Sequence, residues 1–305
     1  WWLVRLAVVV VLAATLLGTL SWAVYHWLLP ASWSQNSAKN IVIVPATIEF
    51  STKHILFASI SYAEAKASLN LIPAELQVEV PGGYGQYPLR SVYPLLGLDQ
   101  QPPSTVVATY SHILGLPVDE VWVVHQPTLL DQATLAAAST DGAVSRQFVA
   151  QLATAIRWQQ LQTPLRLKER WQLAQFLQDR PLRVVAVTDL AQWQQQQAQR
   201  YLGRFKNCRV AIVNAAQVRG LGSRVSAILE RTGATVVRLT DAESVVSSQI
   251  TVLPAQLECQ SLIQHLQHLF PQPVPVTTAP DLVTRSRSEL EVILGTDLGQ
   301  FVQPR

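Results

Sequence analysis

An uncharged run near the start of the chain restricts its fold more than any other feature. Residues 6–29 contain no Asp, Glu, Lys or Arg. As an α-helix this run would span about 36 Å, at about 1.5 Å per residue, which exceeds the bilayer hydrocarbon core of about 30 Å. Aromatic residues flank both of its ends, as they do at membrane interfaces: Trp1, Trp2, Trp22, Tyr25 and Trp27. We predict a transmembrane anchor over 1–30 and a polar tether over 31–40.

A cleaved signal peptide is the alternative for this run, but the apolar region of a signal peptide is shorter. Arg5 precedes the run and Lys39 is the first cation after it, a weak bias that places the N-terminus inside. We therefore expect a single-pass protein of the cell membrane with its bulk extracytoplasmic. The formal net charge of +3 is spread along the chain, which argues against a nucleic-acid partner.

The two cysteines suit an oxidising compartment. Cys208 and Cys259 can form a disulfide or remain two buried thiols. Neither lies in a Cys-x-x-Cys or Cys/His pattern, so we predict no metal site from them.

Beyond the tether, short runs of β-branched and aliphatic residues alternate with helical stretches, which favours an α/β sandwich over 41–189. The predicted strands include 41–50, 54–62, 119–125 and 182–188, the predicted helices are near 91–98 and at 104–115, 145–162 and 167–179, and 81–88 is a predicted loop. A glutamine-rich stretch, 190–206, is predicted as a helix running into a linker. From 207 to 300 the pattern predicts a small βαββαβ domain.

The start of that C-terminal domain has the outline of a dinucleotide-binding unit, with an apolar run, glycines, a helix and a second apolar run. A dinucleotide fingerprint needs Gly-x-Gly-x-x-Gly directly after the strand, where the backbone must approach the pyrophosphate. Here Gly220 and Gly222 follow Asn214 only after five residues, and Val225 stands in the third glycine position. We conclude that these glycines shape the loop and the start of the helix.

The same stretch, "VAIVNAAQVRGLGSRVSAILERTGATVVRLTD", together with "ELEVILGTDL", resembles the C-terminal domain of LytR-CpsA-Psr (LCP) proteins. That domain reads V-x-V-x-N-G-(S/T)-G-x-x-G-x-A-x-x-x-A-x-x-L-x-x-x-G-F-x-V and closes with V-x-V-x-L-G-x-D. The matching motif residues are Asn214, Gly220, Gly222, Leu229, Gly233, Val236, Leu294, Gly295 and Asp297. Ala215 and Ala216 depart from the pattern, and the resemblance implies no established catalytic activity.

The preceding part resembles the LCP catalytic domain more distantly. "HILFASIS" followed by "LNLIPAELQVEV" keeps the spacing of two family strands, and "VPGGYGQYPLRSVYPL" parallels the I-P-G-x-G-x-x-K-I-N-x-A-Y segment. The resemblance implies transfer of a glycopolymer from a polyprenyl pyrophosphate to peptidoglycan, with magnesium bridging phosphate oxygens and arginines neutralising them.

The departures from that pattern fall on the chemistry. The metal aspartates correspond to about Thr47 and Lys53, the arginine of R-S-D-T to Ser51, and the I-P-R-D pair to Ala74 and Glu75. A charged lysine cannot ligate magnesium, which prefers carboxylate oxygens. Two arginines remain as candidate phosphate contacts, Arg90 and Arg146.

We therefore predict a degenerate, non-catalytic LCP-like binding or scaffolding module without a cofactor, whose candidate partners are the membrane, a polyprenyl phosphate lipid or a cell-wall glycopolymer. The alternative is an active, magnesium-dependent phosphotransferase that uses displaced acids such as Asp99 or Asp131. A transcriptional attenuator acting on DNA is disfavoured by the anchor and the dispersed charge. His265 and His268 are spaced i, i+3 with no acid close in the sequence, so we predict that they lie on a solvated helix face.

Overall fold

The computed structural model describes residues 38–47, 49, 52–61, 64–125, 146–158, 160–180, 182–201, 205–254, 257–282 and 286–302, together with Thr15. No helix within these ranges has the length and hydropathy needed to cross a bilayer. The predicted anchor over 1–30 lies outside them apart from Thr15. The predicted tether over 31–40 is described only in its last three residues, which belong to the first strand.

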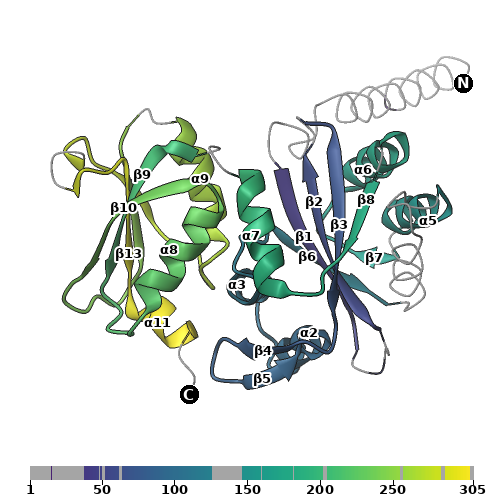
Figure 1. Ribbon diagram of the computed structural model, residues 1–305, viewed down its shortest axis with the longest axis horizontal. Helices are drawn as coiled ribbons and strands as arrows, with labels where there is room; N and C mark the ends of the chain where they lie inside the picture. The colour runs from purple at the N-terminus through teal and green to yellow at the C-terminus, as the bar shows by residue number, and fades with distance from the viewer. Residues whose placement is uncertain are drawn as a thin grey trace, which may run out of the picture.

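The first domain is built on a six-stranded mixed sheet with the order β7-β6-β1-β2-β3-β8 (Figure 1). Its strands are β1 (Ala38–Pro45), β2 (His54–Ser61), β3 (Lys66–Pro73), β6 (Glu120–Val124), β7 (Leu161–Gln162) and β8 (Leu182–Ala186). β2 runs antiparallel to both β1 and β3. On the two sides of these central strands, β6 is parallel to β1, and β8 is parallel to β3. The central strands are buried on both faces, so they read as continuous apolar runs.

Helices cover both faces of this sheet. On one face α5 (Arg146–Arg157) and α6 (Leu167–Asp179) pack against side chains such as Ile41 and Leu56. On the other face α2 (Val92–Leu98), α3 (Pro103–Leu114) and α7 (Leu190–Tyr201) pack against side chains such as Val42 and Phe57. Alternate residues of a strand point to opposite faces, which is why Ile41 and Val42 belong to different cores. The predicted α/β class is confirmed.

The predicted helix in the glutamine-rich stretch is α7 (Leu190–Tyr201), whereas of the predicted linker, residues 202–204 lie outside the described residues and 205–206 belong to β9 (Phe205–Asn214). Trp193 on this helix is buried, and its ring meets Phe57 edge to face, with 5.0 Å between the ring centroids. Asp189 caps its start by accepting hydrogen bonds from the backbone N–H groups of Ala191 and Gln192. The apolar side of this polar helix therefore stabilises the core of the first domain.

Two local predictions in this domain are wrong. Residues 85–88 of the predicted loop form β5 (Gly85–Pro88), which pairs with β4 (Gln77–Val80) in a hairpin. The hairpin can close because Gly82, Gly83 and Gly85 take positive φ angles. The predicted helix over 145–162 ends at Arg157, and its last residues form β7 because they pair with the edge of β6.

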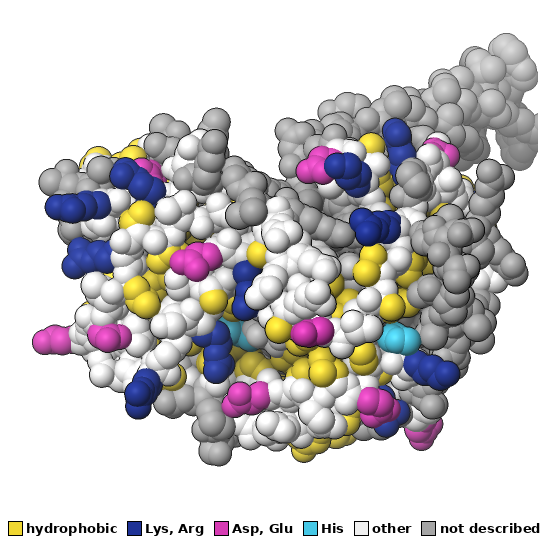
Figure 2. All heavy atoms as spheres, viewed as in Figure 1, with side chains coloured by type: hydrophobic (Ala, Val, Ile, Leu, Met, Phe, Trp, Pro, Cys, Tyr) yellow, Lys and Arg dark blue, Asp and Glu magenta, His cyan; other side chains and the backbone are white. Residues whose placement is uncertain are grey.

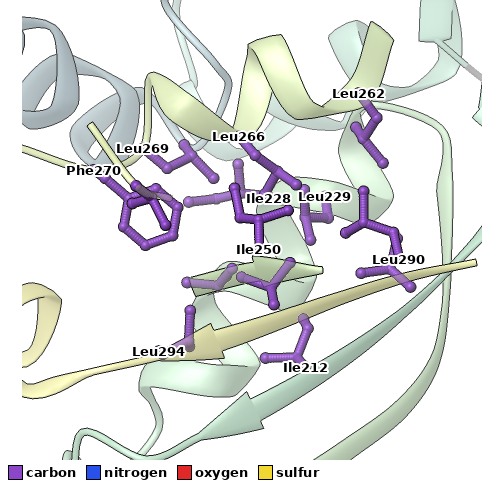
Figure 3. Close-up of a cluster of buried hydrophobic side chains, with 14 of the residues drawn as sticks. Ile212, Ile228, Leu229, Ile250, Leu262, Leu266, Leu269, Phe270, Leu290 and Leu294 are labelled. Atoms are coloured by element: carbon purple, nitrogen blue, oxygen red, sulfur yellow. The ribbon is translucent and has the colours of Figure 1, made fainter. Parts of the chain in front are cut away.

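The C-terminal domain is a five-stranded sheet with the order β10-β9-β13-β11-β12, packed on helices (Figure 1). Its strands are β9 (Phe205–Asn214), β10 (Ala234–Asp241), β11 (Gln249–Val252), β12 (Val276–Thr278) and β13 (Leu290–Leu294), and its helices include α8 (Leu221–Arg231), α9 (Leu257–Gln267) and α11 (Thr296–Val302). Ile212, Ile228, Ile250 and Leu266 are among the side chains that interdigitate in its core (Figure 3).

The six predicted elements of this domain occur in the predicted order, with two additions. The residues after the proline-rich turn form β12, an edge strand parallel to β11. The last predicted strand ends at Leu294, and the chain continues as α11. Cys208 on β9 and Cys259 on α9 are joined by a disulfide and are fully buried.

Candidate functional site

The positions that the LCP resemblance assigns to phosphate chemistry lie at one end of the first sheet. Because β2 is antiparallel to β3, its first residues meet the last residues of β3. The backbone N–H of Ala74 donates to the carbonyl of Lys53 over 2.9 Å, and the N–H of Arg90 donates to the carbonyl of Ala74 over 3.0 Å. Thr47 follows β1 at the same end, while Ser51 lies outside the described residues. Three of the corresponding positions are thus joined by main-chain hydrogen bonds.

The guanidinium of Arg90 is engaged by an acid. Its Nη2 lies 3.2 Å from Glu75 Oε1, with 25% of the Arg90 side chain and 64% of the Glu75 side chain exposed. Its Nε is buried and has no hydrogen-bond partner among the described residues. A partly exposed ion pair of this kind contributes little stability and can be exchanged for another anion. Arg90 therefore has donor capacity left for a ligand oxygen.

Lys53 makes this end of the sheet positive. Burial, and to a smaller extent the neighbouring ammonium of Lys53, lowers the pKa of the adjacent His54. With Arg90 nearby, the local field favours an anion rather than a divalent cation.

The second candidate arginine is not placed beside the first. Arg146 is the first residue of α5, whose helix covers the opposite sheet face from α2 and the 3₁₀ turn Leu89–Ser91 that carries Arg90. The position of the Arg146 side chain is not described.

Of the two acids considered as displaced metal ligands, Asp131 lies outside the described residues and Asp99 is already bonded. The phenol of Tyr84 donates to Asp99 Oδ2 over 2.6 Å, and Gln101 donates to the Tyr84 oxygen. Asp99 lines a cavity of about 560 Å³ between the β4–β5 hairpin and α11, and it is the one carboxylate among the described lining residues.

No group of three or more His, Cys, Asp or Glu side chains that could hold a metal ion occurs in the described part of the chain. The residues at the candidate site, Lys53, Glu75 and Arg90, supply two cations and one acid paired with a cation. Magnesium needs several oxygen ligands, so this donor set does not fit it.

The motif residues of the C-terminal domain stabilise its turns and strand ends. Asn214, at the end of β9, donates from Nδ2 to the carbonyl of Val218 (3.1 Å) and to Asp241 Oδ1 (3.0 Å). These two bonds fix the turn that leads to α8 and join it to the end of β10.

Three of the motif glycines act through the backbone or through close packing. Gly220 and Gly233 take positive φ angles of 78° and 90° at the two ends of the α8 unit, a conformation that favours glycine. Gly222 lies against Leu239, since a Cβ at this position would be 2.6 Å from Leu239 Cδ1. The glycines thus bring α8 close to β10.

The second half of the motif closes the other end of the sheet. The Asp297 carboxylate accepts hydrogen bonds from Ser248 N (2.9 Å to Oδ2), from Ser248 Oγ (2.6 Å) and from Leu298 N (2.8 Å). The Ser248 hydroxyl in turn accepts the N–H of Gly295 (2.9 Å). A Cβ on Gly295 would lie 2.5 Å and 2.6 Å from the backbone of Ser247 and Ser248. Glycine, serine and aspartate therefore form one interlocked unit.

The two domains meet through contacts that the sequence did not indicate. Asp119, at the start of β6, lies 3.4 Å from His268 Nε2 and 3.8 Å from His265 Nδ1. The predicted solvated face for these histidines is wrong: His265 is buried, and burial lowers the pKa of His268 although Asp119 acts in the opposite direction. The sequence pattern around these histidines could not indicate Asp119, because this acid is far from them in the sequence.

His112 on α3 is a second contact between the domains. Its Nε2 donates to the carbonyl of Leu269 over 3.0 Å, and its Nδ1 is buried without a hydrogen-bond partner among the described residues. Burial lowers the pKa of His112 to about 4. Ser104 and Arg231 add bonds to the carbonyls of Pro271 and Gly115 across the same boundary.

Charged side chains of both signs are interspersed over the face shown in Figure 2. Among the described residues of this face (Figure 2), Lys and Arg side chains lie between Asp and Glu side chains rather than in one continuous tract.

Comparisons with known proteins identify the C-terminal domain. Residues 207–298 match the LytR_C family model, described as LytR cell envelope-related transcriptional attenuator. No curated protein matches the chain.

Several solved structures match loosely. The transcriptional regulator yvhJ and TagV, both of Bacillus subtilis, are each 12% identical over 50% of this chain and 84% and 85% of theirs, with TM-scores of 0.34. A transcriptional regulator of Enterococcus faecalis is 11% identical over 52% of this chain and 78% of its own, with a TM-score of 0.36. No property of these proteins is carried to this chain at such TM-scores. The family model therefore confirms the resemblance predicted for the C-terminal domain, since residues 207–298 match LytR_C.

Proposed function

We propose that the chain is a membrane-anchored cell-envelope protein in which a non-catalytic LCP-like domain binds a phosphate-bearing envelope lipid or glycopolymer and is joined to a LytR_C domain. The LytR_C match supports the envelope assignment. The LCP-like sequence pattern over residues 40–195 supports a phosphate-bearing ligand, and the uncharged run at 6–29 supports the anchor.

One observation carries the non-catalytic part of this proposal. Where the resemblance calls for metal-binding aspartates, the chain has Thr47 and Lys53, and the acid next to them, Glu75, is paired with Arg90. Phosphoryl transfer of the LCP type needs a divalent metal between carboxylates and phosphate, and a lysine at that position repels such a metal. Two cations without a metal can still bind a phosphate, because each adds a charge-assisted hydrogen bond.

Binding of a polyprenyl phosphate to the full chain in nanodiscs, measured by isothermal titration with and without magnesium, tests the proposal. We expect binding that does not depend on magnesium. Arg90→Ala should weaken it about 10-fold to 100-fold, the range for a lost charged hydrogen bond, and Glu75→Gln should strengthen it by releasing Arg90. The control is Arg183→Ala, which removes an exposed arginine on β8. Binding that requires magnesium would instead favour the active phosphotransferase.

A further inference from the structure

Three exposed apolar side chains form a continuous patch on α5 and α6. Trp158 follows α5, while Leu167 and Trp171 lie one turn apart on α6, and their exposed fractions are 66%, 59% and 40%. The rings of Trp158 and Trp171 are in contact, with centroids 6.1 Å apart. We call these three residues the tryptophan patch. A contiguous group of this kind, unlike a single exposed apolar residue, is typical of a contact surface.

The segment around the patch is strongly basic. Residues 157–171 contain four basic residues and one acidic residue, a net charge of +3 that equals the formal net charge of the whole chain: Arg157, Arg166, Lys168 and Arg170 against Glu169. The guanidinium of Arg157 lies over the Trp171 ring, 4.2 Å from its centroid. Tryptophan beside lysine and arginine is the composition of a membrane interface, where rings lie at headgroup level and cations bind anionic lipids.

The short tether limits the distance between the first domain and the bilayer. The predicted anchor ends at residue 30 and β1 begins at Ala38. The seven residues between them, 31–37, reach about 25 Å at most when fully extended. The first domain is therefore held at the bilayer surface, where the tether raises the effective concentration of any weak contact with lipid.

We propose that the tryptophan patch docks the first domain onto the surface of an anionic lipid bilayer, with the two indole rings at headgroup level and the basic residues of 157–171 against the lipid phosphates. The proposal rests on the membrane anchoring in the proposed function. It adds a second, reversible membrane contact that fixes the orientation of the domain and of its Lys53 and Arg90 site.

An environment-sensitive fluorophore on the full chain tests the docking. Gln175 is exposed one turn beyond Trp171, and because the native cysteines form a disulfide, Gln175→Cys provides one thiol for a nitrobenzoxadiazole label. In vesicles of phosphatidylcholine and phosphatidylglycerol we expect a blue shift that high salt or pure phosphatidylcholine reduces. The same label on Glu243→Cys, an exposed position in the C-terminal domain, should stay in water.

Two variants separate the contributions of charge and apolar contact. Arg166→Gln with Lys168→Gln should lower the ratio of docked to undocked domain about 25-fold, since each basic residue near an anionic surface is worth about fivefold. Trp158→Ser should lower it in both lipid compositions. Leu98→Ser removes an apolar side chain on α2 that is more exposed (78%) but lies outside the patch, and it should have no effect. Unchanged unfolding midpoints show that the variants remain folded.

The outcomes distinguish this proposal from the anchoring on which it rests. A chain that resists extraction by alkaline carbonate, while the label at position 175 stays in water, retains its anchor and overturns the docking. A chain that carbonate extracts overturns both. A blue shift produced by peptidoglycan fragments but not by lipid reassigns the patch to a glycan, which also overturns the docking.

Discussion

Removing the Asp297 carboxylate should lower the unfolding free energy of the C-terminal domain more than removing an exposed side chain of that domain. Asp297 accepts hydrogen bonds from the backbone and hydroxyl of Ser248 and from the backbone of Leu298. In Asp297→Ala the N–H of the buried Ser248 has no acceptor, at a cost of about 1–3 kcal/mol, and its hydroxyl loses a charged partner. Because the N–H of the buried Leu298 loses its acceptor as well, we expect a total loss of about 3 kcal/mol or more.

The Ser248 hydroxyl supplies the second half of a double-mutant cycle. Ser248→Ala leaves Gly295 N–H without its acceptor and should cost about 1.5 kcal/mol. The double variant should be less unstable than the sum of the two single variants by about 1 kcal/mol, because both remove the same hydroxyl–carboxylate bond.

These free energies can be measured by urea unfolding of the full chain in detergent, with hydrogen exchange of the β11 and β13 amides as the readout. The midpoint should shift without a change in slope. Asp281→Ala, which removes an exposed acid of the same domain, serves as control and should stay within about 0.5 kcal/mol. A loss below about 1 kcal/mol for Asp297→Ala, or strict additivity in the double variant, would refute the structural role assigned to the motif aspartate.

Three further changes test other parts of the structure. Reducing the Cys208–Cys259 disulfide, or replacing both cysteines with serine, should lower the unfolding free energy by about 4 kcal/mol, the value for a loop of 51 residues; an unchanged melting curve would contradict it. Gly295→Ala should cost about 3 kcal/mol of unfolding free energy, because the added Cβ would collide with backbone atoms. Gly220→Ala should cost about 1–2 kcal/mol, because its Cβ would be in open space but the residue has a positive φ. Calorimetry should show the larger loss of stability for Gly295→Ala. The pKa of His112 is about 4 in the folded state and about 6.5 in the unfolded state. The unfolding free energy should therefore be highest above pH 6.5 and fall by up to about 3 kcal/mol as the pH drops toward 4, because the unfolded state binds a proton first. His112→Gln should make the unfolding free energy depend less on pH in this range.

The class and order of elements were predictable because they depend on local patterns. Alternating β-branched runs and helical spacing predicted the α/β class and the six principal elements of the C-terminal domain, and the motif identified that domain. One error is local, since residues 85–88 of the predicted loop pair with the neighbouring β4; the others lie where the pairing partner is distant in the sequence. Residues 161–162 continue a helical pattern but pair with β6, and Val276–Thr278 form a strand because β11 offers an edge.

The candidate site divides in the same way. The lysine at the position where the LCP resemblance implies a metal-binding acid could be named without coordinates, and its effect on catalysis stays a prediction. The pairing of Arg90 with Glu75 and the approach of Asp119 to His265 and His268 were decided by the tertiary structure. Composition and periodicity act over a few residues, whereas ion pairs and domain contacts form between segments that only the folded chain brings within a few ångströms. The residue types at the candidate site were thus determined by the sequence, and the partner of each side chain was decided by the tertiary structure.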